Sequence, residues 1–208
     1  MSLRYRLSIL IPTLCVGLAA LSVTSASALT PVFINEIHYD NVGADTGEAI
    51  EIAGPAGTNL AFWKIRLYNG AGGTVYDTIL MAGVIPNQCN GHGTIAYAWT
   101  PIQNGSPDGM ALIDNNGIVV QFLSYEGTFT AVGNEANGML STDIGVAESA
   151  TTPVGYSLQL GGMGLYYENF TWSAEAPASF TTCNPGQTFT APLPVAASTW
   201  GAVKAIYR

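Results

Sequence analysis

The sequence predicts an all-β protein built as an immunoglobulin-like sandwich of two antiparallel sheets. Apolar and polar residues alternate with a period of two in several short segments, as in strands with one buried face. These segments are separated by clusters rich in glycine, proline, asparagine and serine. No segment shows a long apolar pattern with the period of 3.6 that an α-helix requires. Seven or more short strands at this spacing favour a two-sheet sandwich.

The first half of the chain is expected to form four strands. We place them at residues 32–39, 49–52, 63–68 and 75–80. In the third of these strands the bases Lys64 and Arg66 share one face, and apolar residues occupy the other. That pattern indicates a sheet with one face in the core and one face in water.

The second half continues in the same way. We expect strands at residues 94–99, 110–114, 118–125, 156–160 and 170–172. The segment Asn115-Asn116-Gly117 predicts a hairpin turn between two of them. Residues 130–153, rich in glycine, serine and alanine, are expected to form a long ordered loop.

The chain divides into three parts, of which residues 1–28 are predicted to be a secretory signal. Two arginines precede an apolar run over residues 7–23, and small residues follow it, so we expect cleavage after Ala28. A membrane helix is disfavoured because proline and glycine interrupt the run. A lipid anchor on Cys15 is disfavoured because Leu14 precedes it, where a small residue is needed.

Residues 29–191 are the predicted sandwich, and residues 192–208 are a linker followed by a short C-terminal tail. Pro192-Leu193-Pro194 indicates a stiff connection. The tail beyond it places Trp200 and Val203 on one helical stripe, which is typical of a short amphipathic segment that docks on a surface. The alternative is a frayed terminus packed in part on the sandwich.

The charge balance argues against direct binding of nucleic acid. After removal of the signal the chain keeps fourteen acidic residues and four bases, a net charge of −10. A protein that binds a phosphate backbone presents a basic patch instead. We therefore expect an extracellular ligand or protein partner of another kind.

Cys89 and Cys183 remain after cleavage, and we expect them to form a disulfide in an oxidising compartment. Such a bond closes a loop of about ninety residues, which contributes roughly 4 kcal/mol in the chain-entropy model. The alternative is two separate buried thiols. A zinc site is disfavoured because the cysteines and the two histidines lack the spacing of paired ligands.

Several segments, taken in order, resemble the lamin-tail domain. The start of that domain is matched by residues 34–41, 47–52 and 59–65, and its longer bacterial form by residues 102–109, 120–127 and 143–146. The resemblance covers about residues 31–188. It implies an immunoglobulin-like sandwich that serves as a binding or scaffolding module, often attached to extracellular nucleases. The chain departs from the family at Phe62, where lamin-tail domains commonly place glycine, and no nuclease domain accompanies the module here.

One polar loop is a candidate calcium site. Asp40, Asn41, Asp45 and Glu48 supply four oxygen-bearing side chains within nine residues of a predicted loop. Calcium binds six to eight oxygens from loops of this kind. The alternative is a solvated turn that uses aspartate, asparagine and glycine for their backbone preferences, because the spacing is not that of an EF-hand.

Two further groups of polar residues were weighed for catalysis. His38 lies near Glu36 in a predicted strand, where it would bind a metal or act as a general acid or base. The alternative is an ordinary histidine at the surface or at the edge of a sheet. Glu126 and Asp143 would make a glycosidase-like pair if they lay close together, whereas acids in glycine-rich loops are usually solvated.

Aromatic residues offer one more interpretation. A platform for sugars would use Trp63, Trp99, Trp172 and Tyr125, although such residues in a sandwich more often belong to the core or rim. The common hydrolase motifs are absent from the sequence.

The sequence therefore predicts a secreted binding, adhesion or scaffolding module without catalysis of its own, with no required cofactor and with Ca2+ as the candidate ion. Two alternatives stay open. One is an accessory or catalytic part of a metal-dependent extracellular nuclease or phosphodiesterase, and the other is a structural component of the cell surface.

Overall fold

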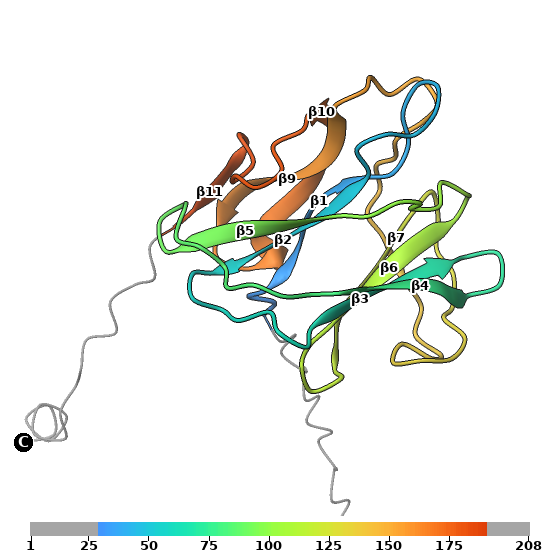
Figure 1. Ribbon diagram of the computed structural model, residues 1–208, viewed down its shortest axis with the longest axis horizontal. Coiled ribbons are helices and arrows are strands. Elements are labelled where there is room, and N and C mark those ends of the chain that lie inside the picture. The colour runs from blue at the N-terminus through green and yellow to red at the C-terminus, as the bar shows by residue number, and fades with distance from the viewer. Residues whose placement is uncertain (1–28, 191–208) are drawn as a thin grey trace, which may run out of the picture.

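Two β-sheets face each other in the computed structural model, which describes residues 29–190 (Figure 1). One sheet has six strands in the order β10-β9-β1-β2-β5 with β11 paired to β9, and the other has five in the order β4-β3-β6-β7-β8. The predicted two-sheet sandwich is confirmed. The strands are β1 (Phe33–His38), β2 (Ala49–Pro55), β3 (Lys64–Asn69), β4 (Thr74–Leu80), β5 (His92–Ala98), β6 (Asp108–Ile113), β7 (Val119–Tyr125), β8 (Thr142–Asp143), β9 (Tyr156–Gly164), β10 (Phe170–Pro177) and β11 (Gln187–Phe189).

Most strand pairs are antiparallel, and the exceptions are β9 with β11 and β7 with β8. The short strands β8 and β11 were not predicted, because two or three residues carry no readable alternation. Strand β2 continues to Pro55, beyond the predicted end at Ile52. Proline is tolerated there because the ladder with β1 has already ended at Ala53, so Pro55 lies at an edge. Within the described part of the chain no helix is long and apolar enough to span a membrane.

The main core lies between the two sheets. Strand β3 contributes Ile65 and Leu67, both fully buried, while Lys64 and Arg66 point to the opposite face as predicted. That opposite face is not open to water, however. Residues 127–141 cover it, and a second apolar cluster forms beneath them from Tyr68, Ala111, Ile113, Phe122, Phe129, Ala131 and Ala136.

Glu135 holds the covering loop in place. Its carboxylate binds Lys64 Nζ at 2.6 Å and Arg66 Nε at 3.0 Å. The hydrogen bonds from Arg66 lower the pKa of Glu135 to about 2. Residues 29–190 contain one lysine, Lys64, and one arginine, Arg66, and both bind Glu135. The other carboxylates of residues 29–190 therefore have no lysine or arginine to bind.

A disulfide joins Cys89 to Cys183, with their Cα atoms 6.5 Å apart, and confirms the predicted pairing. It ties the connection before β5 to the segment after β10. That segment, residues 178–187, lies across the outer face of the six-stranded sheet and contacts β1, β2 and β9. As a result, every residue of β1 is buried, although strand alternation predicts one solvated face.

Phe62 has an unusual backbone. It precedes β3 with φ of 68°, in the left-handed region, and its side chain is 85% exposed. This region costs a non-glycine residue about 1–2 kcal/mol. Glycine adopts this conformation without strain.

We expect the Phe62→Gly variant to be more stable than Phe62→Ala by about 1 kcal/mol, because both remove an exposed ring and only glycine relieves the left-handed strain. Urea denaturation of the two variants measures the difference. Equal stabilities would show that the backbone at residue 62 is not strained in solution.

Candidate functional site

Loops from both sheets meet at one end of the sandwich. The loop after β1 lies beside residues 148–155 (Figure 1), and Val42 N donates to Thr152 O at 2.9 Å. The loop after β5 joins them through Asn104 Nδ2, which is 3.3 Å from Asp45 Oδ2. We call this region the acidic loop end. It contains seven of the fourteen acidic residues: Asp40, Asp45, Glu48, Asp108, Glu126, Asp143 and Glu148.

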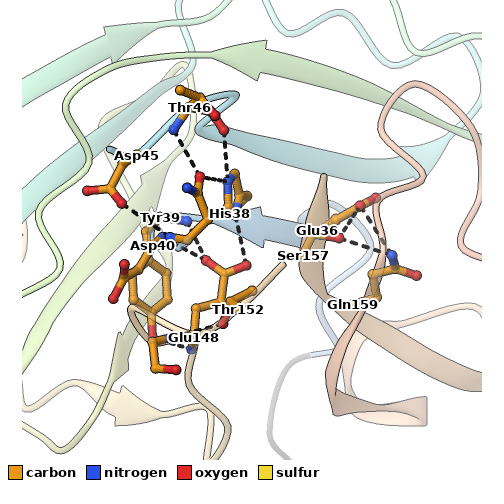
Figure 2. A network of polar contacts seen from close by, with 12 residues as sticks. Glu36, His38, Tyr39, Asp40, Asp45, Thr46, Glu148, Thr152, Ser157 and Gln159 are labelled. Carbon is orange, nitrogen blue, oxygen red and sulfur yellow. Dashed lines mark hydrogen bonds and ion pairs between the residues drawn. The ribbon is translucent and has the colours of Figure 1, made fainter. Parts of the chain in front are cut away.

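An ion pair between His38 and Glu148 lies beneath these loops (Figure 2). Glu148 Oε1 is 2.8 Å from His38 Nδ1, and Glu148 Oε2 accepts the backbone N–H groups of Tyr39 at 2.6 Å and Asp40 at 2.9 Å. The other ring nitrogen, Nε2, faces Asn41 Oδ1 at 3.2 Å and Thr46 O at 3.1 Å. Acceptors at both nitrogens favour the doubly protonated imidazolium.

The pKa of His38 reflects this arrangement. Burial lowers it, but the hydrogen bond and the negative charge of Glu148 outweigh burial, so the pKa is raised overall. His38 is 2% exposed, and the expectation of a surface or edge histidine was wrong. The reason is that β1 is an inner strand whose end is covered by the loop carrying Glu148.

Asn41 shapes the loop that follows β1. Its Oδ1 accepts Thr46 N at 2.9 Å, and its Nδ2 donates to Val42 O at 3.0 Å and Ala44 O at 3.1 Å. Asn41 is fully buried. These bonds satisfy backbone groups that would otherwise be left unpaired in a tight loop.

The other three predicted calcium ligands divide into two groups. Glu48 turns to the loop after β5 and accepts Ile102 N at 2.7 Å and the Thr100 hydroxyl. Asp40 and Asp45 lie near each other, and burial together with the negative charge of Asp45 raises the pKa of Asp40. In residues 29–190 no group of three or more histidine, cysteine, aspartate or glutamate side chains is arranged to hold a metal ion. Calcium binding stays a prediction, centred on Asp40 and Asp45.

The remaining sequence candidates are placed as follows. Glu126 and Asp143 line one shallow cavity of about 190 Å³, and burial followed by several neighbouring charges raises the pKa of Glu126. Trp172 and Tyr125 are buried in the core, where Tyr125 stacks on Tyr39 with ring centres 3.9 Å apart. The four-residue sugar platform is therefore wrong, because two of its members are not accessible.

A second polar network was missed by the sequence analysis. Glu36 and Glu51 are fully buried beneath residues 178–187. Glu36 accepts Ser179 N at 2.7 Å, and Glu51 accepts Thr181 N at 2.6 Å. The adjacent polar pair Asn35-Glu36 within an apolar strand was the available signal. A bulge lies between Ile34 and Glu36, and both polar side chains contact residues of the same covering segment.

Burial raises the pKa of Glu51 to about 8 from 4.5, and the charge of Glu36 adds to this effect. Between about pH 4.5 and 8 the folded protein therefore retains a proton that the unfolded chain has lost. Stability contributed by this group is complete below pH 4.5 and falls as the pH rises to about 8.

We expect the free energy of unfolding to decrease by roughly 5 kcal/mol across this window, and the decrease to be smaller by most of that amount in Glu51→Gln. The glutamine oxygen still accepts the Thr181 N–H, so the covering segment keeps its contact. Urea denaturation at several pH values gives both slopes. Identical slopes for the two proteins would contradict the proposed titration of Glu51.

Three kinds of comparison with known proteins found no match to this chain. No protein-family model, no curated protein and no solved structure matches it.

Proposed function

We propose that the chain is a secreted, non-catalytic binding module of lamin-tail type that holds a basic partner at its acidic loop end. The observation that carries this proposal is the concentration of seven carboxylates at one end of the sandwich, while Lys64 and Arg66 are bound elsewhere by Glu135. Four of the seven reach the surface, namely Asp40, Asp45, Glu126 and Asp143. A surface of one charge attracts a partner of the opposite charge and speeds its association.

The loops are already held in one arrangement. Glu148 fixes the end of β1, Glu48 fixes Ile102, and Asp108 accepts the N–H groups of Gly70 and Gly105 at 2.8 Å each. A rigid surface loses little conformational entropy on binding, which favours affinity. The exposed acids Asp45 and Asp143 project from this framework.

The groups best suited to proton transfer are engaged within the protein. Both nitrogens of His38 face internal acceptors, and the oxygens of Glu36 accept bonds from Ser157 and Ser179. These contacts support a structural role for His38 and Glu36. They favour binding over catalysis as the function of this end of the sandwich.

Two observations support the family and the location. The left-handed backbone at Phe62 suits the glycine that lamin-tail domains commonly have there. The Cys89–Cys183 disulfide suits an oxidising compartment, as secretion requires. The predicted signal at residues 1–28 and the tail at residues 192–208 lie outside the described residues.

The test uses residues 29–208 and a lysine- and arginine-rich peptide. We expect micromolar binding that weakens by about tenfold or more between about 50 and 300 mM salt. The combined variant Asp40→Asn, Asp45→Asn, Glu126→Gln should lose at least about tenfold in affinity. Glu175→Gln, which neutralises an exposed acid of β10, is the matched control and should bind normally. Isothermal titration calorimetry measures each affinity.

Two further arms separate the alternatives. Titration with calcium chloride tests the predicted ion at Asp40 and Asp45, with the same combined variant as reference. Incubation with DNA and calcium, magnesium or manganese tests catalysis, and metal-dependent turnover that follows the purified protein would overturn the non-catalytic proposal. If the affinity for the peptide changes neither with salt nor in the combined variant, the acidic loop end is not the binding surface.

A further inference from the structure

A surface cavity of about 340 Å³ lies between the beginning of β2 and the end of β5. It is lined by Gly47, Glu48, Ala98, Trp99 and Thr100. Ala49 pairs with Ala98 in the antiparallel ladder, and Trp99 N donates to Glu48 O at 3.1 Å. Glu48 and Trp99 are thus the next opposed pair, and opposed side chains project to the same side of a sheet. Glu48 and Trp99 therefore line the cavity side by side.

Glu48 is a buried carboxyl group without a cationic partner. It is 5% exposed, and its hydrogen-bond donors are the Ile102 N–H and the Thr100 hydroxyl, which are both neutral. No lysine, arginine or histidine of residues 29–190 lies within ion-pair distance of it. Buried carboxylates are normally paired, and a carboxylate accepts about four hydrogen bonds, so Glu48 retains acceptor capacity.

Trp99 is held in a fixed orientation. Its Nε1 donates to Asp77 Oδ2 at 2.9 Å, and the side chain is partly buried against the core. The polar edge of the indole is thereby satisfied inside the protein. The face of an indole ring carries negative electrostatic potential and attracts cations, more strongly than the rings of tyrosine or phenylalanine do.

We propose that this cavity, the Trp99 pocket, binds the guanidinium group of an arginine supplied by the basic partner. The inference rests on the proposed function and states which basic side chain of the partner the protein prefers. Guanidinium is planar, stacks on aromatic faces and donates in a fork that matches a carboxylate. An ammonium group is a compact, strongly hydrated charge, so it stacks less favourably on the indole and cannot form a forked pair of hydrogen bonds with Glu48. The pocket therefore selects arginine over lysine.

The test compares two peptides of one sequence, in which every basic residue is either arginine or lysine. We expect the arginine peptide to bind the wild-type protein about tenfold more tightly. Trp99→Leu keeps apolar volume and removes the indole, and Glu48→Gln keeps an acceptor for Ile102 N–H and removes the charge. Both variants should lose the preference for arginine. Trp99→Leu changes no carboxylate and should retain salt-dependent binding of the lysine peptide, whereas Glu48→Gln removes one acid of the loop end and should weaken the binding of both peptides.

Matched controls change the same residue types elsewhere. Phe62→Leu removes an exposed aromatic ring beyond the opposite end of β2, and Glu175→Gln removes an exposed acid. Both should keep the preference for arginine. Circular dichroism checks that each variant is folded. A measurement on the wild-type protein avoids any dependence on variants: the indole N–H resonance of Trp99 should shift with the arginine peptide, while that of the core residue Trp172 should not.

The outcomes distinguish the two proposals. Equal, salt-dependent binding of both peptides, or an unchanged preference in Trp99→Leu, would overturn the Trp99 pocket and leave the acidic loop end standing. Failure of both peptides to bind the wild-type protein would overturn both. Loss of the arginine preference in the two pocket variants alone, together with the Trp99 resonance shift, is the result that the proposal requires.

Discussion

The ion pair between Glu148 and His38 is the contact on which the loop end depends. One carboxylate oxygen binds the imidazole, and the other accepts two consecutive backbone N–H groups where β1 ends. The same imidazole binds Asn41 and the carbonyl of Thr46, so a single buried cation links the loop after β1 to the segment before β9. Breaking such a pair leaves an uncompensated buried charge, which is more costly than the pair itself is stabilising.

The small number of lysine and arginine residues determines the charge of the surface, as the ion pair determines the conformation of the loops. Glu135 binds both Lys64 and Arg66 on the outer face of the five-stranded sheet. The carboxylates at the loop end are satisfied mainly by backbone N–H groups and hydroxyls, as Glu48 and Asp108 are. Such donors compensate the local polarity of a carboxylate and leave its net charge in place. A strongly negative end is the physical result.

Burial of Glu36 and Glu51 has a different consequence. These carboxylates receive N–H groups from residues 178–187, which the disulfide at Cys183 also holds. The covering segment turns the outer face of β1 and β2 into an interior. The cost is a raised pKa for both glutamates, so the contacts that close this face become less stabilising as the pH rises.

Several features followed from the sequence because they depend on local pattern. Alternation in Lys64–Tyr68 correctly predicted which side chains of β3 enter the core, and Asn115-Asn116-Gly117 predicted the turn between β6 and β7. The cysteine pair followed from the two cysteines that lie beyond the predicted signal at residues 1–28. The polar loop after β1 was located correctly, and the calcium site assigned to it stays a prediction.

What the sequence alone determined was the class of fold, most strands, the disulfide and the excess of negative charge. Only the tertiary structure decided that His38 is buried, that Glu48 faces Trp99 and that Glu36 lies beneath a covering segment. The partners in those contacts are far apart in the chain: Glu148 is 110 residues from His38, and Ser179 is 143 residues from Glu36. Periodicity reports which face of a strand a residue occupies, but the element that covers that face is set by long-range packing.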